Sequence, residues 1–144
     1  MQESLTPALE PTDCNCQVLR QAARHVSQIY DNHLAGTGLT TSQYSILAKL
    51  GRLGPLSINE LAKLMVMDRT TLGRAVKPLE RDKLIKVAPD DDARRRKLML
   101  TATGETRRKA AAEKWLEAQK EFELSFGVPE SAEMRTVLRR VVAL

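Results

Sequence analysis

The sequence lacks the features that mark membrane, secreted or enzymatic proteins. Among its 144 residues, no run approaches the roughly 20 apolar residues that span a bilayer. The first 13 residues have neither the basic start nor the apolar centre of a secretory signal, so we expect a cytoplasmic protein. A Gly-rich phosphate loop, paired carboxylates in a pocket pattern and a Ser/His/Asp arrangement are all missing. We therefore predict no enzyme activity and no cofactor.

Cysteine is scarce as well, because the chain contains only Cys14 and Cys16. A disulfide framework is therefore excluded for a cytosolic chain. Residues two apart on a helix point about 200° apart, so the two thiols could share a metal ion only if Cys14 preceded the helix. Even with His25 and His33 available, we predict no metal site.

Charge is distributed unevenly along the chain. The formal net charge is +5, and residues 69–97 hold ten Lys and Arg against five Asp and Glu. Residues 1–13 are acidic, hold two prolines and contain little that could pack, which predicts a flexible tail. A locally basic region inside a balanced chain favours phosphate binding, while a solvated charged face is the simpler alternative.

Helical periodicity dominates the rest of the chain. Capping-box spacing at Thr40 with Gln43 and at Ser57 with Glu60 marks two helix starts, and Asp68 is predicted to cap a third. The six predicted helices are 15–35, 40–53, 59–66, one that begins after Asp68, 101–126 and 131–142. Two short strands, 85–87 and 97–101, are predicted between the fourth and fifth helices.

The fourth helix carries the most informative pattern. At about 100° per residue, one face collects the apolar residues Leu72, Ala75, Val76 and Leu79. The opposite face collects Thr70, Gly73, Arg74, Lys77 and Arg81. A turn-rich segment, 89–97, follows with three acids and then four bases. A basic helix followed by a basic hairpin predicts a protein that binds DNA at two adjacent grooves.

The first, fifth and sixth helices are too amphipathic to stand alone. The residues that need a covering surface are Trp115, Leu116, Phe122, Phe126, Val137, Leu138 and Val141. In a chain of this length, we expect that surface to be a second copy of the protein, in a two-fold dimer. The predicted fold class is mainly α with a small β-hairpin (α+β).

Taken in order and at these spacings, the residues resemble the MarR family of winged helix–turn–helix regulators over residues 14–144. The stretches that carry the match are GLTTSQY at 38–44, LSINELA at 56–62, DRTTL at 68–72 with 79–80 and 84–85, and DAR at 92–94 with Leu98, 100–101 and Gly104. The resemblance implies a homodimer on pseudo-palindromic DNA, usually a repressor, released by a small organic ligand or an oxidant. It divides the chain into a winged helix–turn–helix domain, 37–102, and a helical dimerisation region, 14–36 and 103–144.

Two residues depart from the family pattern. Lys83 stands where the family usually has Gly, so either it adopts a left-handed conformation at a cost on the order of 1 kcal/mol or the turn differs. Pro78 lies inside the recognition helix and removes one backbone hydrogen bond. We therefore predict a bend or local distortion near Arg74.

The first half of the recognition helix is the part that enters a major groove in such domains. Arg74 is the candidate for contacting bases, because a guanidinium can pair with guanine through two hydrogen bonds. In the wing, Arg94 is expected to reach the minor groove, with Asp92 orienting its side chain. The other predicted DNA contacts are Arg69, Thr70, Thr71 and Lys77 on the helix and Arg95, Arg96 and Lys97 in the wing.

Cys16 is a candidate redox sensor, because Arg20 one turn further could favour its reactive thiolate. Hydroperoxide-sensing members of the family carry a reactive cysteine at the equivalent place, and Tyr30 matches one of the tyrosines that serve it. Tyr30 lies about 21 Å along the helix, so it could meet Cys16 only from the partner subunit. Arg20 stands where those sensors have a second tyrosine, and a small buried hydrophobe is the simpler interpretation of Cys16.

The competing effector is a small organic ligand, often an aromatic acid, bound between the DNA-binding lobe and the dimer helices. Arg20 or His33 could receive its carboxylate, while the simpler interpretation of His33 is a buried neutral histidine with a hydrogen-bond partner. The alternative function is a winged-helix module for protein interaction without sequence-specific DNA binding. The arginines around Asp92 and the hydroxyls on the basic helix favour DNA.

Overall fold

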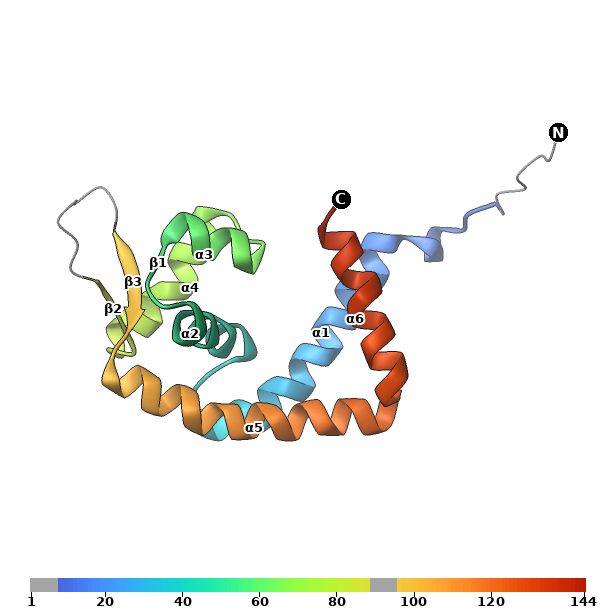
Figure 1. The fold of residues 1–144 in the computed structure, drawn as a ribbon. Coiled ribbons are helices and arrows are strands. Elements are labelled where there is room, and N and C mark those ends of the chain that lie inside the picture. Colours follow the sequence, from blue (N-terminus) through green and yellow to red (C-terminus); the bar gives the residue numbers. More distant parts are fainter. Residues whose placement is uncertain (1–7, 89–95) are drawn as a thin grey trace.

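The computed structural model describes residues 8–88 and 96–144 and consists mainly of helices (Figure 1). In chain order, the elements are η1 (Pro11–Asp13), α1 (Asn15–Leu34), η2 (Ala35–Thr37), α2 (Thr41–Leu53), β1 (Leu56–Ser57), α3 (Ile58–Met65), α4 (Arg69–Arg81), β2 (Ile85–Val87), β3 (Lys97–Leu100), α5 (Ala102–Phe126) and α6 (Val128–Val142). This order confirms the predicted fold class. No helix in the described residues is long and apolar enough to cross a membrane.

Helices α2, α3 and α4 pack with the strands into one lobe (Figure 1). The predicted capping boxes are both present: the Thr40 hydroxyl accepts from the Gln43 N–H at 3.2 Å, and the Ser57 hydroxyl accepts from the Glu60 N–H at 3.1 Å. The buried residues of the core are Leu34, Leu39, Ile46, Leu47, Leu50, Leu61, Ala62, Leu72, Val76, Leu79, Leu84, Ile85, Leu98 and Ala111. The lobe therefore has an apolar core, and one face of α4 packs against it.

The small sheet has three antiparallel strands in the order β1-β3-β2. Strands β2 and β3 confirm the two predicted strands, except that Thr101 caps α5 rather than extending β3. Strand β1 was not predicted, because two residues are too few to show a period-two pattern. Its pairing of Leu56 with Leu98 attaches the start of α3 to the sheet.

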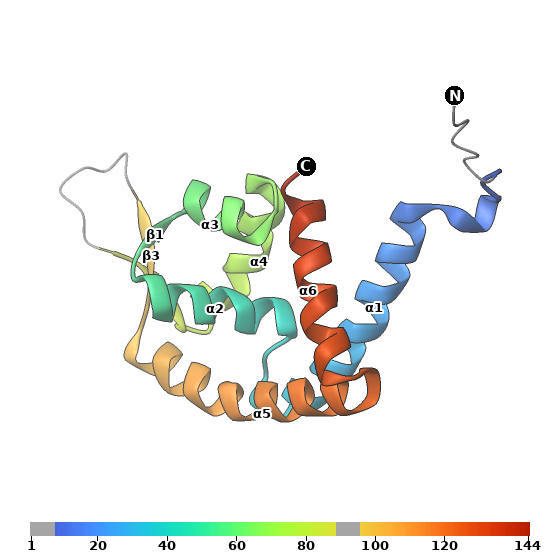
Figure 2. The ribbon, with the colours of Figure 1, turned by 45° about the vertical axis from the view of Figure 1, so that its right-hand side comes forward.

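Helices α1, α5 and α6 form a second group. Helix α5 begins beside the sheet and runs along the lobe, and α1 and α6 both extend from the same side of it (Figures 1 and 2). Helix α1 packs on α5 and on α2, so it belongs to both groups. The large apolar residues of this group that remain exposed in the single chain are Val18, Leu19, Leu116, Leu124, Phe126, Val128, Val137, Val141 and Val142.

Trp115 corrects one prediction about this group. Its ring stacks on Tyr44 of α2, with centroids 6.2 Å apart, and it packs against the core of the lobe. Trp115 therefore has a covering surface within its own chain. Periodicity placed Trp115 on an apolar face, but it could not tell whether that face meets the lobe or a second copy.

The structure also bears on three local predictions, which concern the start of α6, the backbone at Lys83 and Pro78. Helix α6 begins at Val128 rather than near Ser131, because Pro129 occupies its first turn, where a missing N–H breaks no helical hydrogen bond. Lys83 has φ 57°, so the left-handed alternative is the correct one. Pro78 lies within α4 without ending it, and the bend near Arg74 stays a prediction.

Candidate DNA interface

Helix α4 is fixed to the lobe by one face and exposes the other. Leu72, Val76 and Leu79 have exposed fractions of 0%, 3% and 1%. The exposed side chains on α4 include Arg69, Thr70, Thr71, Arg74 and Lys77. Among the described residues, no carboxylate forms an ion pair with any of the three cations in that set. The predicted amphipathic division is confirmed, and the exposed face is available to an external polyanion.

The start of α4 is held by Asp68. One carboxylate oxygen of Asp68 accepts from the Thr71 N–H at 2.8 Å, and the other accepts from the Thr71 hydroxyl at 2.7 Å. Both bonds hold the pKa of Asp68 below its ordinary value, and the bond from the Thr71 N–H has the larger effect. The Thr71 hydroxyl hydrogen is therefore used within the cap, and only the oxygen lone pairs of Thr71 remain for a DNA contact.

The turn from α3 to α4 contains a strained residue. Val66 has φ 53°, in the left-handed region that a β-branched side chain disfavours. The next N–H, that of Met67, donates to the Ala62 carbonyl oxygen at 2.9 Å and closes the turn. The turn between α3 and α4 therefore forms although the β-branched side chain of Val66 disfavours its backbone conformation.

The strands bring the base of the predicted wing close to the start of α3. Lys97 pairs in register with Ser57 across β3 and β1. The Ser57 N–H bond, and to a smaller extent the charge of Lys97, lower the pKa of Glu60. Arg96 is exposed just before β3. The predicted contacts of Asp92, Arg94 and Arg95 lie outside the described residues.

The other end of α4 is joined tightly to α5. The Thr101 hydroxyl donates to the Lys83 carbonyl oxygen at 2.6 Å and accepts from the Gly104 N–H at 2.9 Å. The Thr101 N–H donates to the Leu84 carbonyl oxygen at 3.1 Å. A Cβ added at Gly104 would lie 1.9 Å from that same oxygen, so the two segments are in direct backbone contact. These contacts connect the segment that follows α4 directly to the start of α5.

The candidate redox residues lie at the opposite end of the molecule, on α1. Cys16 and Arg20 are both exposed, so a buried hydrophobe is the wrong interpretation of Cys16 within the single chain. Cys14 precedes α1 and caps it, because its sulfur accepts from the Gln17 N–H at 3.5 Å. No group of three or more potential metal ligands occurs in the described part of the chain.

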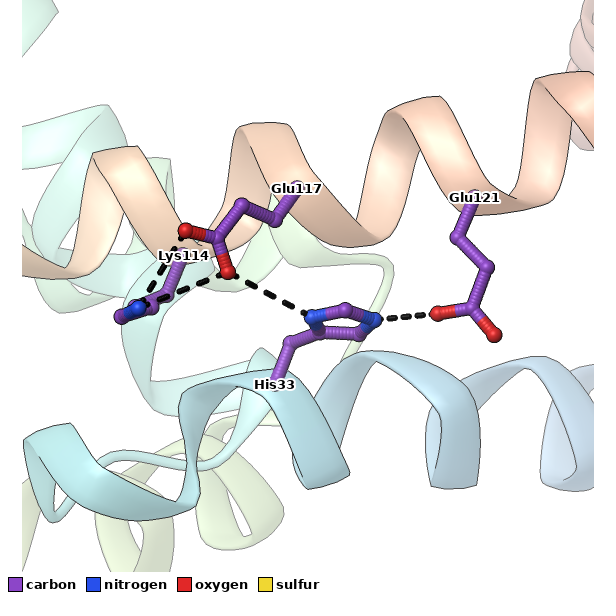
Figure 3. A network of polar contacts seen from close by, with 4 residues as sticks. All are labelled: His33, Lys114, Glu117 and Glu121. Atoms are coloured by element: carbon purple, nitrogen blue, oxygen red, sulfur yellow. Dashed lines mark hydrogen bonds and ion pairs between the residues drawn. The ribbon is translucent and has the colours of Figure 1, made fainter.

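Tyr30 and His33 are directed toward α5. The Tyr30 hydroxyl donates to the side-chain oxygen of Gln119, and burial, followed by the charge of Glu123, raises the pKa of Tyr30. The His33 ring lies between two glutamates, as Figure 3 shows. The side chain of His33 is 25% exposed, so the buried histidine of the sequence interpretation is corrected to a half-buried one with carboxylate partners.

A pocket of about 370 Å³ lies between α2 and α5. The stacked rings of Tyr44 and Trp115 form one wall of it, and Lys49 and Arg52 contribute two cations. Burial, followed by the charge of Arg52, lowers the pKa of Lys49. Sequence reasoning missed both cations, because the spacing within α2 does not show that α5 places Trp115 beside them. The predicted carboxylate receivers, Arg20 and His33, do not line this pocket.

Comparison with known proteins reveals the same architecture. The model of a family described as the MarR family matches residues 37–96. A crystal structure of the M. tuberculosis transcriptional regulator MosR in complex with DNA is 34% identical to this chain, with a TM-score of 0.81, and the match covers 90% of this chain and 94% of that one. The structure of a probable transcriptional regulator from Pseudomonas aeruginosa is 29% identical, with a TM-score of 0.82 and coverage of 92% and 99%. The HTH-type transcriptional regulator YwoH of Bacillus subtilis is 26% identical over 108 residues, 75% of this chain and 79% of that protein.

Proposed function

Because the chain belongs to the MarR family of winged helix–turn–helix DNA-binding transcriptional regulators, we propose that it acts in the cytoplasm as a homodimeric repressor of a pseudo-palindromic operator. The family consists of regulators rather than enzymes. The observation that carries the proposal is the exposed face of α4, where Arg69, Arg74 and Lys77 have no carboxylate partner among the described residues. A helix with this division presents its cations to a groove while its buried face fixes their orientation.

In the proposed domain organisation, residues 37–102 bind DNA, and residues 14–36 and 103–144 form the dimer interface between two copies. A groove of about 760 Å³ between the start of α1 and the end of α6 supports this division. Apolar side chains that line it, including Val18, Val137 and Val141, are exposed in the single chain. A two-fold dimer would cover the same patch on both copies.

Light scattering tests the dimer. Val141→Glu places a charge in the groove and should convert the dimer to a monomer at micromolar concentration, because an unpaired charge in an apolar interface is costly. Val87→Glu is the matched control, since Val87 is an equally exposed apolar residue on the lobe. A Val141→Glu protein that stays dimeric would exclude this groove as the interface.

In the proposed complex, Arg74 contacts bases in the major groove and Arg94 enters the minor groove with Asp92 orienting it. Arg69, Thr70, Thr71 and Lys77 would place α4 on the phosphates, and Arg95 and Arg96 would do so for the wing. Direct base contacts carry discrimination, whereas phosphate contacts carry affinity and salt dependence. The two groups of residues should therefore differ in what their loss does to binding.

Fluorescence anisotropy with a labelled fragment of the protein's own promoter tests this mechanism at fixed salt. Arg74→Ala and Arg94→Ala should each weaken binding at least tenfold, roughly the 1–3 kcal/mol of a bidentate base contact. Lys120→Ala removes one exposed cation from α5 and should leave the affinity within about twofold. Unchanged affinity in both arginine variants would show that neither arginine makes the proposed contact with DNA. Equal affinity of the wild type for a scrambled fragment would favour the protein-interaction module.

The pocket between α2 and α5 favours a small organic anion as the effector. Lys49 and Arg52 would receive its carboxylate, and the Tyr44 and Trp115 rings would cover an aromatic body. Because α5 is joined to α4 at Thr101, a ligand that separates α2 from α5 would change the position of α4. Titration of aromatic carboxylates into the protein, followed by Trp115 fluorescence, tests this. Binding that survives Lys49→Met together with Arg52→Met would place the effector elsewhere.

A further inference from the structure

Gly73 lies in the interior of α4, on the face of the helix that carries the exposed cations. On a helix surface, the neighbours of a residue are those three and four positions away. The exposed neighbours of Gly73 in this sense are Arg69, Thr70 and Lys77. Arg74, which is also exposed, follows directly in the sequence. The missing side chain therefore leaves a gap in the middle of the basic face, and we call it the Gly73 gap.

The other glycines of the chain have structural explanations that Gly73 lacks. Those with a positive φ, which favours glycine over other residues, are Gly38, Gly54 and Gly127. At Gly51 and Gly104, an added Cβ would lie 2.8 Å and 1.9 Å from its nearest neighbour. Gly36 has open space around it, but it follows the end of α1, where glycine is common. The φ of Gly73 is not positive, and an added Cβ there would meet no described atom within 4 Å.

This glycine also has a cost for the helix that contains it. In a helix interior, glycine is less favourable than alanine by about 1 kcal/mol. Helix α4 loses this stability at Gly73 without any compensating contact among the described residues. Glycine is common where a backbone and a ligand approach each other closely. The position of Gly73 among the exposed cations therefore points to an external partner that comes close to the backbone of α4.

The chemistry of the Gly73 gap favours an apolar group as its occupant. Gly73 lies far enough inside α4 for its N–H and C=O groups both to be used in helical hydrogen bonds. The gap thus offers the hydrogens of a Cα atom, and it offers no strong donor or acceptor to a phosphate or to the polar edge of a base. Among the groups that the base pairs present in the major groove, the apolar one is the C5 methyl group of thymine.

We propose that Gly73 sets how closely α4 approaches the operator, and that the Gly73 gap receives a thymine methyl group in each half-site. This inference rests on the proposed function. A side chain at this position would occupy the space of the methyl group, so the gap selects thymine by shape. The close approach also brings Arg74 within reach of its base. Gly73 is thus a positioning and specificity residue that makes no hydrogen bond of its own to DNA.

Fluorescence anisotropy with the promoter fragment tests the close approach. Gly73→Ala should weaken binding about tenfold and Gly73→Val further, because each added carbon holds α4 away from the groove. Urea denaturation should show both variants folded, since alanine and valine are better helix formers than glycine. Gly36→Ala is the matched control: it also adds a Cβ in open space, but outside α4, and should leave the affinity within about twofold.

Two outcomes of this series would overturn the proposal. One is a Gly73→Ala protein that binds the fragment as tightly as the wild type. The other is weaker binding by Gly73→Ala than by Gly73→Val. Alanine is the better helix former and the smaller residue, so that order would mean that stiffening of α4, rather than the size of the side chain, impairs binding.

Replacement of thymine by deoxyuridine in the fragment tests the occupant, because it removes only the methyl group. At one symmetry-related pair of positions, wild-type affinity should fall about fourfold per methyl group, the equivalent of about 0.8 kcal/mol. At the same pair, Gly73→Ala should bind the deoxyuridine fragment at least as tightly as the thymine fragment, because the alanine methyl takes the place of the thymine methyl. A wild type that binds specifically but shows no such pair would overturn the inference alone. A wild type that binds a scrambled fragment equally well would overturn the proposed function.

Discussion

Substitution of Gly104 by Ala should destabilise the protein, although Ala is the better helix former. In the interior of a helix, the exchange normally gains about 1 kcal/mol. At Gly104, the added methyl group would lie 1.9 Å from the Leu84 carbonyl oxygen and 2.8 Å from the Leu84 carbonyl carbon. Both are backbone atoms, so α5 must move away from the end of α4. Overpacking of this kind costs about 1–3 kcal/mol or more.

The movement would also break the hydrogen bonds that join the two segments. The Thr101 N–H lies 3.1 Å from the Leu84 oxygen and its hydroxyl lies 2.6 Å from the Lys83 oxygen, and each such bond contributes about 1 kcal/mol. After subtraction of the helix-propensity gain, we expect a net loss of about 3 kcal/mol in the free energy of unfolding. The loss should accompany weaker operator binding, because the same joint positions α4.

Urea denaturation followed by circular dichroism measures this change. Gly73→Ala is the matched control: Gly73 also lies in a helix, but an added Cβ would meet no atom within 4 Å. That variant should gain up to about 1 kcal/mol. The same substitution is thus expected to have opposite signs at the two sites. A Gly104→Ala protein as stable as the wild type would refute the close approach of α5 to Leu84.

Three further predictions concern the turn, the cap and the thiol. Val66→Gly should stabilise the fold by about 1 kcal/mol in urea denaturation, because it removes a β-branched residue from the left-handed region; a loss would mean that the turn is not strained. Asp68→Ala should lower the urea midpoint at neutral pH. Because the folded state lowers the pKa of Asp68, this difference from wild type should fade as the pH falls below about 4, and a constant difference would contradict the cap. Cumene hydroperoxide should weaken operator binding in the wild type more than in Cys16→Ser if Cys16 is a sensor, and equal losses would exclude that role.

Features set by chemistry within a few residues could be predicted from the sequence. The capping boxes at Thr40 and Ser57 and the cap at Asp68 depend on side chains that lie three residues from their partners, and all three are present. The left-handed conformation of Lys83 was one of two stated alternatives, and the family pattern raised it because a glycine usually stands there. The alternation of buried and exposed residues on α4 is likewise a local pattern, so the exposed face proposed to contact DNA was predicted nearly residue by residue.

Prediction from neighbouring residues was wrong where one residue type occurs in two kinds of local structure. The predicted start of the sixth helix, residue 131, lies after Pro129, because a proline commonly ends a helix. A proline in the first helical turn has a favourable φ and lacks only an N–H that would have had no helical partner. The structure uses Pro129 in this second way, at the start of α6. Whether a proline ends one helix or begins the next depends on where the following helix packs, and the sequence around it does not contain that information.

Features that need a distant partner could be located on a helix face but not paired. Trp115 was predicted to need a covering surface from a second copy, and His33 was predicted either to receive a ligand carboxylate or to be buried with an unnamed hydrogen-bond partner. Trp115 packs on Tyr44, and His33 pairs with Glu121, so each partner lies in an element far away in the sequence. Because the pairing of distant elements could not be predicted, the cations of the α2–α5 pocket were missed, whereas the cations on the exposed face of α4 were predicted. A DNA-binding face needs only one helix with a buried side, whereas a ligand pocket or a charge pair between helices exists only after the helices have been placed against each other.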